Sequence, residues 1–526
     1  MKRVIFLLGV LTTILSTFST ASAYDFEVDG LCYDLISASE RTCAFTQGDK
    51  PYEGVVNIPD SVLVNGRYVR VINMKYEALD YSNISELTIP GSISKFGINY
   101  GECNIGKINI LYGKKALIAY YHTIDDYSFF DRIHVKEMFI DRDIIAKTIK
   151  NHDIEKITIG KNLINFDGGI ISSSLKTVYI EDGPVPISAV GYETISGPIT
   201  YAYIGRDGLK IYTRGKAEHL IFGKNATKTG EYSNCENLTT VEMNNIQVIN
   251  AGAFAGSKKL TNINFPKTLK MIGSESFLGS GIKELILDCD LEHIGAKAFQ
   301  NCNQLGKIQI KKVGAIYSYA FDGCCKVRTV ILGEGVEKIN DYAFSRNSSL
   351  KEIVLPNSLI YIGYNAFQSC DSLKTIEIGD DIEKIDRYAF ADCKSLESIV
   401  ISATVPPQIY ESTFESKTYL NCTLYVPTES IDLYKEAYGW KGFWNIKGID
   451  SFSSVKDDIV KNEYLISILP THRGVRVLNK DKNSIIRVFS IQGTLIKETR
   501  DDEINNLPAG LYVVKVGNKS FKVSLL

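Results

Sequence analysis

The chain has 526 residues, with 59 basic and 61 acidic side chains and a formal net charge of −2. This near balance gives no electrostatic basis for binding nucleic acid or an anionic membrane surface, so neither is expected as a partner. The length is large for one globular core. A repeat protein has no such limit, because each repeat brings its own slice of core.

The first 23 residues have the pattern of a secretory signal peptide. Met1-Lys2-Arg3 is a positive start, the stretch from Val4 to Leu15 is mostly apolar, and Ala21-Ser22-Ala23 is a small-residue cleavage site. We therefore predict cleavage before residue 24 and export to the cell surface or the extracellular space. The residue directly after the cleavage site is Tyr24 and not a cysteine, so no lipid anchor is expected. No stretch of the chain is long and apolar enough to predict a membrane span.

Residues 24–70 are predicted to form a β-rich N-terminal cap. Turn residues at Gly30, Gly48-Asp49 and Asn65-Gly66 separate short β-prone segments. Such a cap protects the exposed edge of a strand ladder from pairing with another chain. Cys32 and Cys43 lie in this segment, and in an exported chain they are candidates for a disulfide.

Residues 71–230 carry an irregular strand signal. Apolar-x-apolar strands end at intervals of 18 to 30 residues, at Ile89, Ile110, Ile140, Ile159, Ile180, Ile204, Phe222 and Met243. One interpretation is a series of degenerate turns of the repeat described next. The other is a separate domain inserted between about 105 and 230, where the aromatic repeat is missing and Tyr and Asp accumulate.

Residues 231–426 repeat with a period of 22 to 24 residues. Ala-Phe or a close variant returns at Phe254, Phe277, Phe299, Phe321, Phe344, Phe367, Phe390 and Phe414. The apolar residues after each Phe, such as Leu396, Ile399 and Ile401, suit a turn that leads into a short strand. One turn cannot bury this apolar edge alone. Stacked turns with parallel strands bury it continuously, so a solenoid is predicted.

One column of this repeat, three residues after the aromatic position, holds small side chains. It is occupied by Cys235, Ser257, Ser280, Cys302, Cys324, Asn347, Cys370 and Cys393. Interchange of Cys, Ser and Asn predicts a tight buried turn in which free Cys acts as a small hydrophobe, rather than a row of disulfides. The chain has no C-x-x-C pair, so no zinc site or other metal site is predicted.

The repeat frame resembles a known family. The pattern I-G-x-x-A-F-x-x-C-x-x-L, present as Ile362-Gly363-Tyr364-Asn365-Ala366-Phe367-Gln368-Ser369-Cys370-Asp371-Ser372-Leu373, resembles the BspA-like leucine-rich repeats of bacterial surface proteins. The resemblance implies a leucine-rich-repeat solenoid, a parallel strand ladder with short helical or irregular returns. It also implies a non-catalytic surface scaffold for adhesion to host proteins, host cells or other bacteria. The rival functions are polysaccharide capture, for which exposed aromatic platforms on one face are expected, and a structural spacer without a ligand.

The C-terminal part is predicted to contain a cap, a linker and a small domain. Residues 427–450, with helical spacing and both tryptophans, resemble the closing cap of such repeats, and residues 451–463 form a polar linker. Residues 464–526 change to a period of two, which predicts a small β-sandwich. Val488 to Gly493 and Leu507 to Val516 resemble the type IX secretion sorting domain of Bacteroidetes, which implies that export machinery as a partner. Family members commonly end on a basic residue, whereas this chain ends with Ser524-Leu525-Leu526.

The candidate ligand-binding residues are the outward positions of successive repeat strands: Asn264, Ile286, Gln309, Ile331, Val354, Glu377 and Val400. Four of the seven are aliphatic, and an exposed aliphatic stripe can mark a protein-binding surface. The alternative is that β-branched residues simply favour strands. Tyr319, Tyr342 and Tyr388, two residues before the aromatic column, are candidates for recognition or, more simply, half-buried spacers.

No motif predicts an enzyme or a cofactor. The six histidines are scattered, and the chain has no H-E-x-x-H, G-x-S-x-G, P-loop or G-x-G-x-x-G sequence. His293 lies in a repeat turn, where a surface position is expected. The predicted ligand is therefore an extracellular protein or glycan bound without catalysis.

Overall fold

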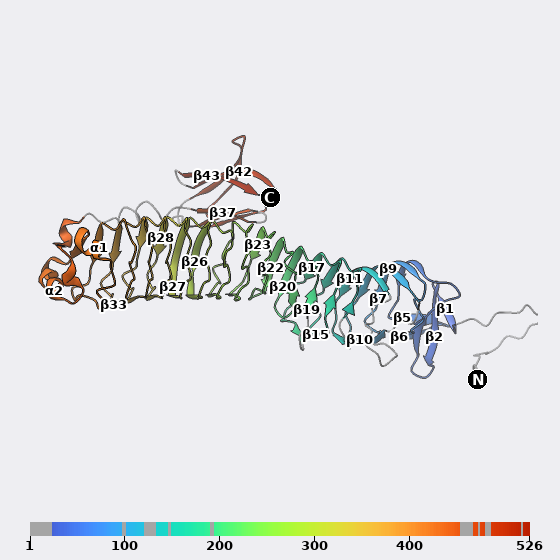
Figure 1. The fold of residues 1–526 in the computed structure, drawn as a ribbon. Coiled ribbons are helices and arrows are strands. Elements are labelled where there is room, and N and C mark those ends of the chain that lie inside the picture. The colour runs from blue at the N-terminus through green and yellow to red at the C-terminus, as the bar shows by residue number, and fades with distance from the viewer. Residues whose placement is uncertain are drawn as a thin grey trace, which may run out of the picture.

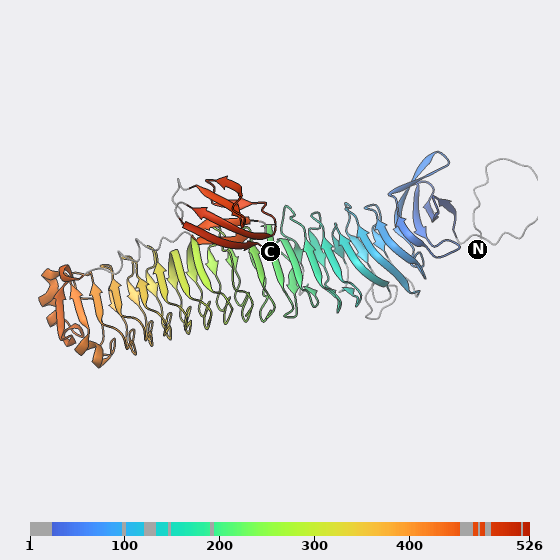
Figure 2. The ribbon, with the colours of Figure 1, turned by 90° about the horizontal axis from the view of Figure 1, so that it is seen from above.

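The computed structural model describes residues 24–96, 101–119, 133–145, 149–189, 194–452, 467–471, 474–478, 485–516 and 519–525. The predicted signal peptide, residues 1–23, and residues 453–463 of the predicted linker lie outside this part of the chain. The described residues form a long coil of parallel strands with a cap at each end (Figure 1). A separate β-domain lies beside the middle of the coil (Figure 2).

Three sheets form the N-terminal half of the coil. The first has the order β1 (Phe26–Val28), β2 (Leu31–Ser37), β3 (Thr42–Thr46), β6 (Arg67–Met74), β8 (Lys95–Phe96), β10 (Leu117–Ala119), β12 (Ile144–Ile145), β15 (Asn165–Asp167) and β18 (Ser188–Ala189), and β5 (Ser61–Val64) pairs with β6. The second has the order β4 (Glu53–Asn57), β7 (Asn83–Ile89), β9 (Cys103–Ile110), β11 (Ile133–Ile140), β14 (Lys156–Ile159), β17 (Thr177–Ile180), β20 (Tyr201–Arg206), β22 (His219–Asn225) and β23 (Thr240–Met243). The third contains β13 (Ile149–Lys150), β16 (Ile170–Ile171), β19 (Thr194–Ser196) and β21 (Lys210–Tyr212).

The regular repeats continue the coil with two sheets and a helical end. One sheet contains β24 (Val248–Ile249), β25 (Met271–Ile272), β26 (Glu284–Ile294), β27 (Lys307–Ile316), β29 (Lys338–Ile339), β31 (Tyr361–Ile362) and β33 (Lys384–Ile385), together with β28 (Thr329–Leu332) and β30 (Glu352–Val354). The other contains β32 (Thr375–Ile378), β34 (Ser398–Ile401), β35 (Thr423–Val426) and β36 (Asn445–Gly448). Two helices and three 3-10 turns close the end: α1 (Ser416–Asn421), η1 (Thr428–Ser430), α2 (Ile431–Glu436), η2 (Trp440–Gly442) and η3 (Ile449–Ser451).

One hydrophobic core runs through the whole coil, as the repeat predicts. In β32 the side chains of Ile376 and Ile378 are buried and Glu377 between them is partly exposed. The rings of the aromatic column stack on one another: six successive pairs from Phe277 to Phe414 have centroids 5.0 to 5.4 Å apart. This spacing is close to the distance of about 4.8 Å between paired strands, so the rings follow the ladder turn by turn.

The Ala-Phe return is irregular rather than helical. Its backbone is left-handed two residues before the Phe, at Gly252, Glu275, Lys297, Tyr319, Tyr342, Asn365 and Tyr388, and again two residues after it, at Gly256, Gly279, Asn301, Gly323, Arg346, Ser369 and Asp392. Each non-glycine residue in this conformation costs about 1 kcal/mol. Hydrogen bonds between turns offset the cost. The amide of Phe321, for example, donates to the carbonyl of Ala343 at 2.8 Å, and the pattern repeats along the coil.

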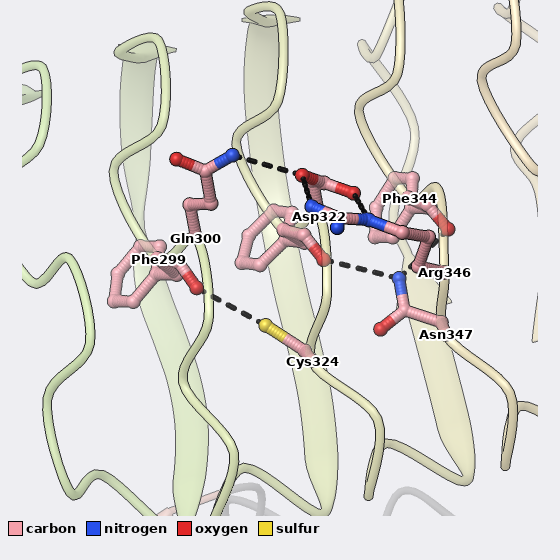
Figure 3. Close-up of polar contacts among 8 residues, drawn as sticks. Phe299, Gln300, Asp322, Cys324, Phe344, Arg346 and Asn347 are labelled. Atoms are coloured by element: carbon pink, nitrogen blue, oxygen red, sulfur yellow. Dashed lines mark hydrogen bonds and ion pairs between the residues drawn. The ribbon is translucent and has the colours of Figure 1, made fainter.

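The small-residue column makes hydrogen bonds that the sequence interpretation missed. The thiol of Cys324 donates to the carbonyl of Phe299 at 3.1 Å (Figure 3), and Cys302, Cys370 and Cys393 make the same bond. Asn347 donates its amide to Phe321 at 3.1 Å. At five of the eight positions of the column, a small donor thus reaches the carbonyl of the aromatic residue in the preceding turn, a role that Cys and Asn share.

A buried carboxylate links three regular turns. The side chain of Asp322 is 1% exposed, and it accepts hydrogen bonds from Arg346 Nε at 2.9 Å and from Gln300 Nε2 at 2.8 Å (Figure 3). A second guanidinium nitrogen of Arg346 also reaches this carboxylate at 2.5 Å. A buried charge needs such partners, because leaving it unpaired is costly.

The strands between residues 105 and 230 belong to the solenoid. Strands β9, β11, β14, β17, β20 and β22 pair in parallel within one sheet that also contains β4, β7 and β23. Their inward residues join the same core as the regular turns. Of the two interpretations, the degenerate turns are therefore the ones present in the structure, and no inserted domain interrupts the ladder in the described residues.

The candidate disulfide between Cys32 and Cys43 is not formed. Both cysteines are free thiols. They lie on the paired strands β2 and β3 but three positions out of register, because Cys32 is opposite Thr46 and Cys43 is opposite Leu35. Three residues of strand span about 10 Å, which is too far for a disulfide bond.

The C-terminal β-sandwich is present and has a core of its own. One sheet contains β37 (Ser467–Thr471), β38 (Gly474–Leu478) and β41 (Glu503–Asn505), and the other contains β40 (Leu495–Thr499), β39 (Ile486–Ser490), β42 (Gly510–Val516) and β43 (Lys519–Leu525). Its buried residues form a cluster separate from that of the solenoid. The sandwich lies beside β23 and β26 in both views (Figures 1 and 2), and Lys267 Nζ lies 3.8 Å from Asp502.

Candidate binding surfaces

The predicted strand positions lie in one outward column of the ladder. Residues Ile286, Gln309, Ile331 and Val354 are in register across four successive strands, and Glu377 is in register with Val400. The remaining predicted position, Asn264, lies in the segment between β24 and β25. The structure thus brings these residues into a row, and their binding of a ligand stays a prediction.

The aliphatic members of this column are less exposed than predicted. Ile286 is 7% exposed, Val354 is 6% exposed and Val400 is 3% exposed, while Ile331 is partly exposed. The tight turn spacing explains this burial, because each side chain is flanked by neighbours of the same column. Val400, for example, lies in register between Glu377 and Tyr425. The prediction that these aliphatic side chains form an exposed stripe is therefore wrong for Ile286, Val354 and Val400.

An outward column of the N-terminal sheet carries aromatic residues. Tyr179 and Tyr203 are in register, and their rings stack with centroids 4.4 Å apart. The hydroxyl of Tyr203 donates to Asp182 at 2.8 Å, and burial raises the pKa of Tyr203. Sequence reasoning missed this pair, although the outward tyrosines of T-V-Y-I and Y-A-Y-I could have indicated it.

A second surface, which we call the tyrosine face, consists of Tyr319, Tyr342, Tyr364 and Tyr388. Their rings form a row, with centroids 4.6, 5.5 and 5.7 Å apart from one neighbour to the next. Tyr364 is 36% exposed and Tyr388 is 44% exposed, whereas Tyr319 and Tyr342 are partly buried. The interpretation as half-buried spacers therefore holds for two residues but not for Tyr388.

A polar cluster adjoins the tyrosine face at its C-terminal end. Asp386 accepts a hydrogen bond from the Tyr361 hydroxyl at 3.1 Å, and Lys384 Nζ lies 3.0 Å from the same carboxylate. The Lys384 ammonium lies over the ring of Tyr410 at 5.5 Å, and the Arg387 guanidinium lies over that ring at 4.7 Å. Burial raises the pKa of Tyr361 to about 12, and the hydrogen bond to Asp386 raises the pKa of Lys384. The tyrosine face therefore ends in two fixed cations.

The described residues contain no candidate metal centre. No group of three or more His, Cys, Asp or Glu side chains is placed to hold an ion in the part of the chain that the structure covers. His293 lies on the surface and stacks on the ring of Tyr317, with centroids 5.1 Å apart. His122 and His472 lie outside the described residues. None of the helices in the described ranges is long and apolar enough to cross a membrane.

The regular repeats match a known family of repeat sequences. Residues 225–349 and 314–441 match the family model "BspA type Leucine rich repeat region", in six copies. Similar solved structures are a leucine-rich repeat protein from Bacteroides ovatus (20% identity, TM-score 0.41, covering 81% of this chain and 100% of that chain) and a leucine rich cell surface protein from Faecalibacterium prausnitzii (15%, 0.25, 84% and 97%). The pneumococcal vaccine antigen PcpA is also similar (17%, 0.27, 80% and 98%).

No curated protein sequence matched the chain. The family match spans the turns that contain the aromatic column, the small-donor column and the tyrosine face. It identifies the regular turns of this chain as leucine-rich repeats of the BspA type.

Proposed function

We propose that this chain is an exported, non-catalytic scaffold for adhesion, which binds a protein of a host cell, a host matrix or another bacterium through the tyrosine face. The carrying observation is the row of four tyrosine rings that ends in Lys384 and Arg387. The BspA-type family match supports a repeat protein of this class. The family match does not extend to adhesion, which we propose from the tyrosine face alone.

The geometry of the tyrosine face favours a protein over a polysaccharide as its ligand. The rings of Tyr319 and Tyr342 are nearly parallel, with an angle of 5° between their planes, so each ring covers a face of the other. Tyr364 and Tyr388 meet their neighbours edge to face, at 64° and 85°, so the row as a whole presents no flat platform of parallel rings to a sugar. Sugar rings pack on aromatic faces, whereas protein surfaces use tyrosine edges and hydroxyls, which give contact area at low entropic cost.

Export and surface location are part of the proposal. They are supported by the charged start, apolar stretch and small-residue cleavage site within residues 1–23. We also propose that the C-terminal sandwich acts as a sorting domain of the type IX kind. Its support is the resemblance of residues 488–493 and 507–516, and a core that is separate from the solenoid. Deleting residues 464–526 should then trap the chain inside the cell.

The experiment is surface plasmon resonance of residues 24–526 against fibronectin, fibrinogen, laminin, collagen and proteins extracted from bacterial surfaces. The test variant is Tyr364→Ser with Tyr388→Ser. The matched control is Tyr68→Ser with Tyr438→Ser, because these tyrosines are 68% and 61% exposed and lie elsewhere. The proposal predicts saturable binding that falls at least about tenfold, or 1.4 kcal/mol, in the test variant only.

Two results would contradict the assignment. Binding of none of these proteins would leave a spacer as the better description of the solenoid. Binding that survives the tyrosine variant but is lost in Ile331→Asp would move the site to the strand column. Ile331 is the suitable residue there because it is partly exposed, whereas an Asp at the buried Val354 would damage the core.

A further inference from the structure

A polar groove crosses the beginning of the long N-terminal strands, away from the tyrosine face. Its volume is about 700 Å³, and it extends over six successive turns from Glu53 to Ser174. One wall is a row of side chains in register: Glu53 on β4, Asn83 on β7, Asn104 on β9 and His134 on β11. Ligand sites in proteins commonly have volumes of about 300 to 1,000 Å³.

The groove exists because the ladder is interrupted there. Ile84 pairs with Ile105, and Glu86 pairs with Lys107, but no ladder pair joins Ser85 and Gly106 between them. The strands approach closely at this point. A Cβ atom added to Gly106 would lie 2.5 Å from the carbonyl oxygen of Ser85. Glycine therefore permits the close approach, and the lack of a side chain at Gly106 leaves the groove open at this point.

Two asparagine side chains of the groove, Asn83 and Asn104, are exposed, and their amide groups make no hydrogen bond to any other described residue. They lie on neighbouring strands in register, so the two amides repeat at the strand spacing of about 4.8 Å. His134 Nδ1 lies 2.5 Å from Asp153, which fixes the ring at the groove wall.

The lining excludes several classes of ligand. Carboxylates of Glu53, Asp153 and Glu155 outnumber the single lysine, Lys136, so an anionic chain would be repelled. The only apolar residues of the lining, Ile84 and Ile105, are 2% and 1% exposed and offer no pocket for a hydrophobic side chain. The strands β7 and β9 are paired on both sides, so a peptide cannot add to the sheet as a further strand.

We propose that this groove binds a neutral oligosaccharide chain. The lining has no Phe, Tyr or Trp ring for a sugar to stack on, so hydrogen bonds would hold the chain: the amide groups supply donors and acceptors, and the carboxylates supply acceptors, for the sugar hydroxyls. A hexopyranose unit is roughly as long as the strand spacing of about 4.8 Å, so successive units match successive turns of the solenoid. This site lies beyond the proposed protein-binding face and does not depend on it.

The test is isothermal titration calorimetry of residues 24–526 with neutral hexasaccharides of glucose, mannose, galactose and xylose, and with a heparin hexasaccharide. The test variant is Asn83→Ala with Asn104→Ala. The control is Asn262→Ala with Asn445→Ala, two exposed asparagines outside the groove. We expect saturable binding of at least one neutral hexasaccharide, weakened at least about tenfold in the test variant and unchanged in the control.

Three outcomes would overturn the proposal: no binding of any neutral hexasaccharide, binding of heparin alone, or binding that the Asn83 and Asn104 substitutions leave unchanged. A high-mannose glycoprotein, measured before and after enzymatic removal of its glycan, separates a glycoprotein source from a free polysaccharide. The Tyr364→Ser and Tyr388→Ser variant should bind the hexasaccharide normally. Failure of the protein-binding face can thus be told apart from failure of the groove.

Discussion

The substitution Phe344→Ala should open a local weak point in the solenoid. Phe344 is fully buried, and its ring stacks on Phe321 and Phe367 with centroids 5.1 and 5.4 Å away. Removing a buried Phe side chain typically costs about 3 to 5 kcal/mol. The loss of two ring pairs, each worth about 0.5 to 1.5 kcal/mol beyond burial, places this site near the upper end, at about 4 to 5 kcal/mol.

The effect should be local, because each turn contacts only its neighbours. Hydrogen exchange of residues 24–526, followed by mass spectrometry of peptides, measures the opening free energy turn by turn. Exchange around Phe321, Phe344 and Phe367 should accelerate about a thousandfold, since every 1.4 kcal/mol is a factor of ten. Peptides from β9 to β14 should be unchanged. The control Phe344→Leu keeps most of the buried volume and should cost about 1.5 kcal/mol.

The refuting results are specific. A loss below about 1 kcal/mol for Phe344→Ala would mean that the stacked column contributes little to the core. Equally accelerated hydrogen exchange in β9 to β14 would mean that the coil unfolds as one cooperative unit. That result would contradict the expectation that each turn is stabilised only by its neighbours.

Three further predictions concern the polar and thiol groups of the core. Arg346→Ala should lower the free energy of unfolding, measured in urea, by about 2 to 3 kcal/mol, because it removes the cation that pairs with buried Asp322. A similar loss of stability when Arg346→Ala is made in an Asp322→Ala background would contradict the pairing. Cys324→Val should cost about 1 to 3 kcal/mol by leaving the Phe299 carbonyl without its donor, whereas Cys324→Ser should cost less than about 1 kcal/mol; equal losses would show that only size matters. Stability should also fall as the pH rises from about 8.5 towards 12, because buried thiols stay protonated in the folded chain while those of the unfolded chain ionise, by up to about 1.4 kcal/mol per thiol and pH unit. Unfolding midpoints at pH 7, 9 and 10 test this, and flat midpoints would contradict it; burial raises the pKa to about 12 for Cys43, Cys103, Cys289, Cys393 and Cys422.

The architecture of the regular turns could be predicted because the sequence repeats its own core. Each Phe of the aromatic column must meet the next Phe, so a constant spacing predicts a stack of parallel turns. In the N-terminal half the ladder is carried by apolar pairs, such as Ile157 with Ile159 in β14, and no aromatic column marks the turns at a constant spacing. Two interpretations therefore stayed open there until strand pairing was known.

The backbone conformation of the Ala-Phe segment that connects successive strands was harder to predict than the strands. Its left-handed positions hold Gly252 and Gly279 in some turns but Tyr342 and Arg346 in others, so no single residue type marks them. Bonds between turns stabilise the conformation, and such bonds do not appear in a one-dimensional pattern. The hydrogen bonds donated by the small-residue column could not be predicted for the same reason, because the acceptor, such as the Phe299 carbonyl for Cys324, lies one turn away.

Surface exposure was the least predictable property. Alternation within a strand predicts which side chains point outward, but exposure also depends on neighbours in adjacent turns, as at Val400. The tyrosine face combines residues from two columns, Tyr364 three positions before the Phe and Tyr388 two positions before it, and their ring centroids lie 5.7 Å apart. The candidate disulfide between Cys32 and Cys43 is absent because the register of β2 and β3, rather than proximity in sequence, decides which residues face each other.

The central claim, adhesion through the tyrosine face, is tested most directly by the retention of coated beads on a host-cell monolayer under flow. One set carries residues 24–526 unchanged, and the other carries the variant with Tyr364→Ser and Tyr388→Ser at the same density. The account predicts that the unchanged chain retains beads above the level of uncoated beads and that the variant returns retention to that level. Equal retention by the two chains would contradict it.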